Sequence, residues 1–159
     1  MQDAPPTVTA PQFVARPTQI MGFTSAVKNC VKNNYIGFSG RASRSEYWWF
    51  VLFLQLVPIV GYVLVFSYIS VALGGEDASM SFDTFMNLVM LPSLVTLGFL
   101  LPALSVSVRR MHDTGKSGWL LLVTIIPCIG TILWLVWMIE DGQAHDNAYG
   151  AVPTNIVEQ

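Results

Sequence analysis

The feature that most constrains this chain is a run of 27 residues, from 47 to 73, that contains no charged side chain. As a helix rising about 1.5 Å per residue, this run would be roughly 40 Å long, which exceeds the bilayer hydrocarbon core of about 30 Å. Two further uncharged apolar runs cover residues 88–108 and 119–139. We therefore expect an all-α fold, an integral membrane bundle of three transmembrane helices that span residues 45–73, 86–108 and 119–139.

The third apolar run permits a second interpretation, because Pro127 and Gly130 lie near its centre. A proline followed closely by a glycine suits a turn between two half-helices. Such a re-entrant pair would return the C-terminus to the side on which the run began. Backbone broken inside a membrane has to be covered by protein or face water, and a chain of this size offers little cover. A full crossing is therefore the first prediction, and a re-entrant pair remains open.

The two ends of the chain differ in composition from the apolar middle. Residues 1–20 are rich in Pro, Thr, Gln and Ala and show no hydrophobic period, so we expect a disordered tail. The same stretch has no short apolar core, and it does not fit a cleavable signal peptide. A membrane domain is expected over residues 21–153, and residues 154–159 are expected to form a flexible end.

Residues 22–33 show the periodicity of a short amphipathic helix. One face is apolar and carries Phe23, Ala26, Val27, Cys30 and Val31. The other face is polar and basic, with Lys28 and Lys32, and the segment shortly precedes the first expected span. This pattern predicts an interfacial helix with its apolar face toward the membrane. Packing of that face on another segment of the protein is the alternative.

A capping motif marks the start of the first expected span. Ser43 and Glu46 have the S-x-x-E spacing of a capping box. In this motif the serine hydroxyl accepts a hydrogen bond from the amide of residue 46, and the glutamate carboxylate accepts one from the amide of the serine. The helix should therefore begin near Arg44, with Trp48 and Trp49 as interfacial anchors. We also expect Glu46 to pair with Arg109 or Arg110, which would lock the first two spans together.

The distribution of charge predicts how the chain crosses the membrane. All eight basic residues precede the first span or lie in the hairpin at 109–118, whereas the loop after the first span and the C-terminal segment carry only acids. The positive-inside rule then places the N-terminus in the cytoplasm and, with three spans, the C-terminus in the periplasm. The net charge of −2 creates no basic field, so no nucleic-acid partner is expected.

Several kinds of chemistry find no support in the sequence. His112 and Asp113 resemble a base with its orienting carboxylate, but no nucleophile is tied to them by a motif. Asp113 is expected instead to pair with Arg109 or to cap the turn with Thr114. Neither histidine has a second metal ligand at a suitable spacing, and the expected spans hold no ionisable group for ion coupling. We expect no cofactor, no metal, no disulfide between Cys30 and Cys128, and no enzyme activity.

Two sequence blocks carry a resemblance to a known family. They are GRASRSEYWWF at residues 40–50 and RRMHDTGKSGWLLL at residues 109–122, followed by IPCIG and by NAYG at residues 147–150. Together they resemble the DUF805 family of small bacterial inner-membrane proteins, a domain of unknown function. Met111, Leu120 and Ala148 stand where the family commonly has leucine, an aromatic residue and arginine. The resemblance implies location and architecture but no reaction.

The remaining candidate for function is a basic and aromatic cluster on the cytoplasmic face. Its members are charged, aromatic or imidazole side chains from the two blocks: Arg41, Arg44, Glu46, Trp48, Trp49, Arg109, Arg110, His112, Asp113, Lys116 and Trp119. The cluster either fixes topology alone or makes the protein a non-enzymatic adaptor, subunit or lipid-associated module. The expected partners are the bilayer, anionic phospholipid headgroups, a second copy or another membrane protein. An oligomeric small-molecule permeation or export component is the alternative.

Overall fold

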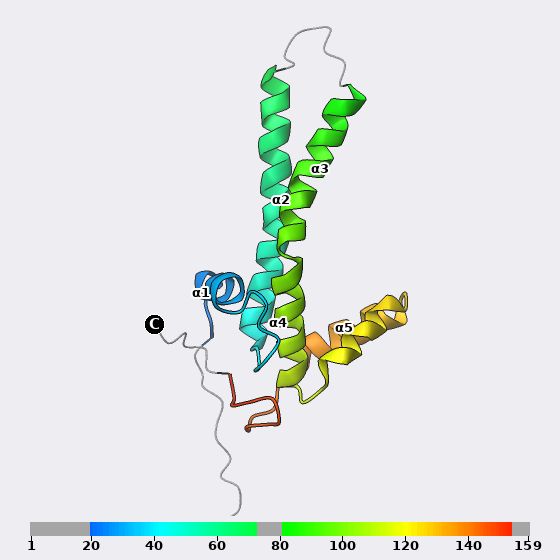
Figure 1. The fold of residues 1–159 in the computed structure, drawn as a ribbon. Helices are drawn as coiled ribbons and strands as arrows, with labels where there is room; N and C mark the ends of the chain where they lie inside the picture. The colour runs from blue at the N-terminus through cyan, green and yellow to red at the C-terminus, as the bar shows by residue number, and fades with distance from the viewer. Residues whose placement is uncertain (1–19, 73–80, 154–159) are drawn as a thin grey trace, which may run out of the picture.

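The computed structural model of the chain describes residues 20–72 and 81–153 (Figure 1). Within these residues the regular structure is helical, and the extended pairing is limited to an isolated bridge between Asn147 and Gly150. The all-α class expected from the sequence is confirmed for this part of the chain. The expected disordered tail over residues 1–20, except its last residue, and the expected flexible end at 154–159 lie outside the described residues.

Two long helical segments form a hairpin that runs most of the length of the molecule (Figure 1). One is α2, Arg44–Ala72, and the other is α3, Phe82–Gly98, followed by α4, Leu100–Asp113. They correspond to the expected spans at 45–73 and 86–108. Among the described residues, one helix, Arg44–Val71, is by itself long and apolar enough to cross a membrane. The expected bundle of three spans is not confirmed.

The second segment of the hairpin is divided at Phe99, which separates α3 from α4. Pro102 explains the break, because a proline has no N–H to donate and its ring collides with the carbonyl four residues earlier. That carbonyl belongs to Gly98, and it accepts a hydrogen bond from the Tyr35 hydroxyl instead. The break therefore ties the loop before α2 to the middle of the opposite helical segment.

The expected third spanning helix over residues 119–139 is wrong as a single helix. The chain forms a 3₁₀ helix, η2, over Gly118–Ile125 and then a short α-helix, α5, over Ile129–Ile139. Pro127 favours extended backbone at the residue before it, where ψ is 113°, and Cys128 takes a positive φ of 63°. The chain reverses there, as in the alternative of two half-helices, and η2 packs against α5 (Figure 1).

The amphipathic segment forms α1, Phe23–Lys28, and continues into a π-helical turn, η1, over Asn29–Asn33. Its apolar face packs on protein, which corrects the expectation that this face points into the membrane. Ala26 and Cys30 are fully buried, and the Phe23 ring meets the Trp49 ring edge to face at 5.8 Å. The alternative left open by the sequence, packing on another segment, is the one observed.

The buried core lies at one end of the hairpin, which we call the cap. The cap comprises the start of α2, the end of α4, and the segments packed around them (Figure 1). Its fully buried apolar side chains come from four parts of the sequence and include Cys30, Ala42, Phe50, Met111 and Met138. Toward the other end of the hairpin, large apolar side chains such as Leu64, Phe66 and Leu94 are more than half exposed.

Candidate functional site

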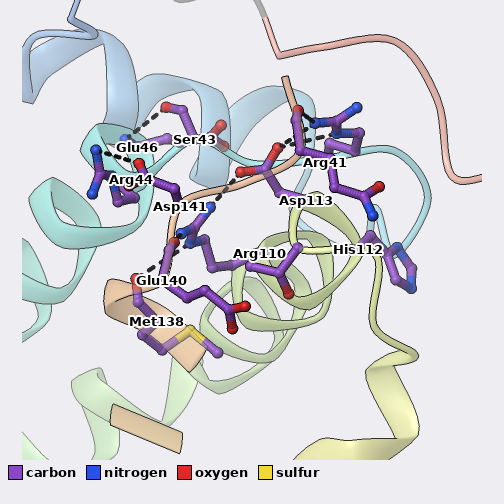
Figure 2. A network of polar contacts seen from close by, with 12 residues as sticks. Arg41, Ser43, Arg44, Glu46, Arg110, His112, Asp113, Met138, Glu140 and Asp141 are labelled. Atoms are coloured by element: carbon purple, nitrogen blue, oxygen red, sulfur yellow. Dashed lines mark hydrogen bonds and ion pairs between the residues drawn. The ribbon is translucent and has the colours of Figure 1, made fainter. Parts of the chain in front are cut away.

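Asp113, at the end of α4, is the centre of a buried ion-pair network in the cap (Figure 2). Its Oδ1 accepts hydrogen bonds from Nε and Nη2 of Arg41 at 3.0 and 2.9 Å, and its Oδ2 pairs with Nη1 of Arg110. All three side chains are fully shielded from solvent. The predicted pairing of Asp113 with Arg109 is wrong, because Arg109 points to a different carboxylate.

The same two arginines also hold the segment after α5, residues 140–153, which we call the C-terminal strap. Arg41 donates to the carbonyls of Gln143 and His145, the latter at 2.7 Å. Arg110 donates to the carbonyls of Met138, at the end of α5, and of Glu140. One buried carboxylate between two guanidinium groups leaves an excess positive charge, and these carbonyl dipoles face it. The network therefore holds the strap by its backbone.

A second buried ion pair joins the start of α2 to α4. Nη1 of Arg109 lies 2.8 Å from Oε1 of Glu46, and both side chains are about 4% exposed. Asn29 donates to the same oxygen at 2.9 Å, and the Cys30 thiol is directed to it at 3.5 Å. Of the two partners predicted for Glu46, the structure has Arg109. Burial raises the pKa of the Cys30 thiol to about 12, so it remains protonated at neutral pH.

The predicted capping box at the start of α2 forms only in part. The Glu46 amide donates to the Ser43 hydroxyl at 3.2 Å, and α2 begins at Arg44 as expected. The Glu46 carboxylate is directed to Arg109 and Asn29 rather than back to the cap residue. A buried cation close by draws the carboxylate more strongly than a single backbone amide does.

Two ion pairs on the surface of the cap connect the basic cluster to the acidic C-terminal strap. Arg44 lies 2.8 Å from Asp141, and Lys116 lies 2.5 Å from Glu140. The sequence predicted that these acids and these basic residues lie on opposite sides of a membrane. That prediction is wrong for the described part of the strap, because contact at these distances requires both groups at the same end of the hairpin.

All eleven cluster residues gather at the cap, but the structure divides them into an interior and a rim. The interior consists of the buried ion-pair residues Arg41, Glu46, Arg109, Arg110 and Asp113. The rim consists of side chains with substantial exposure: Arg44, Trp48, Trp49, Lys116 and Trp119. The buried arginines Arg41, Arg109 and Arg110 are therefore not available to lipid headgroups. Most of the arginines hold the protein together from within.

His112 belongs to neither group, and its ring points away from the Asp113 carboxylate (Figure 2). Nδ1 lies 3.2 Å from the Gly40 carbonyl, and the ring stacks on Tyr149 with centroids 3.9 Å apart. Burial lowers the pKa of His112 below 6.5. The structure therefore does not form the dyad that adjacent His and Asp residues suggested. Over residues 20–72 and 81–153, no group of three metal-binding side chains is present.

The sequence did not indicate the residues of the strap that complete the network. Asn147 donates to the carbonyl of His112 and to the Gln143 side chain, both at 2.9 Å. Its own side-chain oxygen accepts from the Tyr149 amide, and its backbone pairs with Gly150. The signal that was present is the NAYG block, in which an Asn and a Gly at turn spacing predict a local loop but not its docking partner.

Comparison with known proteins places these features in a family context. Residues 35–151 match a family described as "Protein of unknown function (DUF805)". The chain is 38% identical over 123 residues to "Inner membrane protein YhaI" of Escherichia coli strain K12, covering 77% of this chain and 91% of that protein. It is 33% identical over 123 residues to "Inner membrane protein YhaH" of the same strain, covering 77% and 92%. No solved structure matches the chain.

Proposed function

The chain belongs to the DUF805 family of inner-membrane proteins, and on that premise we propose that it is a non-enzymatic membrane module built on its cap. The buried network around Asp113 is the observation that carries this proposal. Both guanidinium groups pair with the Asp113 carboxylate and also donate to backbone carbonyls of the strap. Groups fully committed to such contacts stabilise a fold and do not transfer protons to a substrate. The network is structural, and the rim is the interaction surface.

The proposed arrangement in the membrane has two crossings, with both described ends at the cap. α2 makes the first crossing. α3 and α4, of 17 and 14 residues, are together roughly 46 Å long, which exceeds the hydrocarbon core of about 30 Å. They make the second crossing, and the end of α4 from Arg109 to Asp113 lies beyond it, in the cap. Seven basic residues lie in the described parts of α1, η1 and the two sequence blocks that form the cap. The positive-inside rule favours a cytoplasmic cap. Because the strap is ion-paired to the cap, it belongs to the same side.

Reporter fusions test this arrangement directly. A fluorescent protein that matures only in the cytoplasm, fused to either end of the chain, should fluoresce in both cases. Alkaline phosphatase, which is active only in the periplasm, should be active when inserted within residues 73–80, between α2 and α3, and inactive at either end. A C-terminal fusion with periplasmic activity would reject two crossings and restore three.

The rim supports an adaptor or subunit role through its exposed aromatic side chains. Trp119 is 81% exposed, and Trp48 and Trp49 are each 36% exposed beside the charged Arg44. Tryptophan and arginine are enriched where proteins associate, and they also suit the headgroup level of a bilayer. The rim therefore fits contacts with a second copy, with another membrane protein or with anionic headgroups.

Mass measurement after extraction in mild detergent tests the association. The wild-type chain should exceed the mass of one copy plus its detergent, and Trp119→Ala should shift it toward the monomer. Leu64→Ala, at an exposed apolar position far from the cap, is the matched control and should leave the mass unchanged. A wild-type chain that is monomeric throughout would contradict the subunit proposal. It would also exclude a permeation path lined by several copies.

A further inference from the structure

A pocket of about 540 Å³ lies beside the buried network, between α4, η2 and the C-terminal strap. Leu104, Val108 and His112 form its α4 wall, while Leu121 and Leu122 line it from η2. This volume is in the range of pockets that bind small molecules. The network does not use the pocket, although the RRMHDTGKSGW block contributes several of its walls. It is therefore a separate feature of the cap.

The α4 wall changes from apolar to polar along its length. Leu104, Val108 and His112 are spaced by four residues, so they lie in one row on the helix. At about 1.5 Å per residue, the row covers roughly 12 Å, with Leu104 deepest in the proposed membrane and His112 nearest its surface. Tyr149 lies at the His112 end of the pocket, because the two rings stack. Ser117 lies at the same end, because the amide of the preceding Lys116 donates to the carbonyl of Met111, next to His112, at 3.0 Å. The pocket therefore follows the same polarity gradient as one leaflet of a bilayer.

At the polar end of the pocket, the His112 ring offers an acceptor and the Ser117 hydroxyl offers a donor, in a lining that also includes Trp119 and Tyr149. Because the Gly40 carbonyl can only accept, Nδ1 of His112 carries the proton, and Nε2 of the neutral ring is an acceptor. The Ser117 hydroxyl oxygen accepts from the Trp119 amide at 3.4 Å, which leaves its proton to donate. Burial lowers the pKa of His112 and keeps the ring neutral at pH 7. None of the residues that line the pocket carries a charge at that pH.

These features match one class of amphiphile. An ammonium headgroup with N–H bonds can donate to Nε2 of His112, and an adjacent phosphate can accept from the Ser117 hydroxyl. A zwitterion fits an uncharged lining better than an anionic headgroup does, since neither sign dominates. An acyl chain fits the apolar wall formed by Leu104, Val108 and Leu121.

We propose that this pocket binds a phospholipid whose headgroup is a phosphate joined to a primary amine, as in phosphatidylethanolamine, with an acyl chain along α4. The site rests on the proposed placement of α4 across the membrane. Tyr149 stacks on His112 and so connects the occupied site to the C-terminal strap. η2 lies close to α4 at Gly118, where an added Cβ would be only 2.7 Å from Cγ1 of Val108.

Native mass spectrometry of the purified full-length chain tests the proposal with two matched lipids. Dioleoyl phosphatidylethanolamine and dioleoyl phosphatidylcholine have the same chains and net charge, but the choline nitrogen has no N–H to donate. The wild-type chain should retain one ethanolamine lipid, with an affinity about tenfold above that for the choline lipid. Equal retention of the two lipids would overturn the proposed headgroup contact.

Variants of the pocket separate its two parts. Leu104→Trp places an indole in the apolar part of the pocket and should abolish retention of both lipids. Leu101→Trp changes an exposed α4 residue outside the pocket lining and should leave retention unchanged. His112→Phe keeps an aromatic ring for Tyr149 but removes Nε2, so the preference for ethanolamine should disappear. Ser117→Ala should weaken both lipids to the same extent and preserve the preference.

The outcomes that reject this site differ from those that reject the proposed topology. Retention unchanged by Leu104→Trp, or a preference unchanged by His112→Phe, would show that lipid binds elsewhere on the apolar surface. Binding of a second copy in place of lipid would appear as a dimer mass that Leu104→Trp abolishes, and it would also reject the proposal. Melting of each variant verifies that it is folded, and Ser117→Ala supplies an independent readout if His112→Phe does not fold. The reporter fusions decide the topology separately.

Discussion

At the scale of single residues, Asp113 has the largest consequence for the fold. It joins Arg41, which lies 72 residues earlier in the chain, to Arg110 in its own helix, and none of the three side chains is exposed. A buried ion pair adds little to the free energy of unfolding relative to apolar residues of the same shape. Removing one partner, however, leaves the other charge buried without compensation. Loss of the Asp113 carboxylate would leave the guanidinium groups of Arg41 and Arg110 buried without a compensating negative charge.

We therefore expect Asp113→Asn to lower the free energy of unfolding by about 3–5 kcal/mol. Denaturant unfolding in a fixed detergent, followed by tryptophan fluorescence, measures the change. Asp141→Asn is the matched control, because the Asp141 side chain is 76% exposed beside Arg44, and an exposed pair contributes at most about 1 kcal/mol. Equal effects of the two substitutions would contradict a structural role for the buried network.

Charge reversal tests the pair formed by Glu46 and Arg109. Glu46→Arg should destabilise strongly, since two cations would then meet in a buried site. Adding Arg109→Glu should restore part of the lost stability, whereas adding Arg110→Glu should not, because Arg110 faces Asp113. Recovery stays partial because Asn29 still donates toward position 46. The melting temperatures of the single and double variants measure this recovery. Equal recovery with Arg109→Glu and with Arg110→Glu would refute the pairing of Glu46 with Arg109.

The burial of His112 predicts a dependence of stability on pH. Its pKa in the folded protein is lowered from the ordinary value of 6.5, so the unfolded chain takes up a proton first as the pH falls. Stability from this group is complete above about pH 6.5 and decreases as the pH drops toward the folded pKa. The melting temperature of the wild type should therefore fall more steeply from pH 7.5 to 5.5 than that of His112→Phe. The same dependence of melting temperature on pH in the wild type and in His112→Phe would contradict a role for His112.

The ion pairs show which part of the site the sequence could predict. Pairing of Glu46 with one of two adjacent arginines followed from the charge pattern, and the structure has Arg109. The partner of Asp113 did not follow, because helix spacing favours local neighbours and carries no information on a contact with Arg41. Once Glu46 binds Arg109, the next arginine along α4 faces Asp113.

At the scale of elements, apolar length proved informative for the hairpin but not for residues 119–139. A hydropathy run of 21 residues is compatible with one spanning helix or with two shorter pieces. Backbone chemistry decides between them: Pro127 restricts Ile126 to extended backbone, and the positive φ of Cys128 reverses the chain. The cover that a broken segment needs comes from η2 and α5 packing on one another and on α4.

Gly130 makes that packing possible, which leads to a prediction for the η2–α5 pair. A Cβ at Gly130 would lie 2.1 Å from the Val123 carbonyl oxygen, and backbone atoms cannot move aside as a flexible side chain does. Gly130→Ala should lower the free energy of unfolding by about 1–3 kcal/mol. Gly98→Ala is the control, since nothing lies within 4 Å of its Cβ position. If both substitutions are tolerated in denaturant titrations, the two helices are not in contact.

At the scale of the whole molecule, the cap joins segments that are distant in sequence into one unit. The loop before α2, the end of α4 and the strap meet at Arg41 and Asp113, and Arg41 reaches a carbonyl 104 residues away. The positive-inside rule identified the end of the hairpin where the basic residues gather. It did not reveal the return of the strap, because acidic residues contribute weakly to that rule and an acidic tail is compatible with either side.

If the cap is one cooperative unit, releasing one contact should loosen all of its segments together. Arg41→Gln removes the donors to Asp113 and to the carbonyls of Gln143 and His145, so hydrogen exchange should accelerate over both 114–118 and 140–153. Arg44→Gln, which breaks only the exposed pair with Asp141, should leave both segments protected. The Gln143 amide, which donates to the Asp113 carbonyl at 2.8 Å, reports the docking directly. Faster exchange confined to the residues next to position 41 would show that the strap docks without the network.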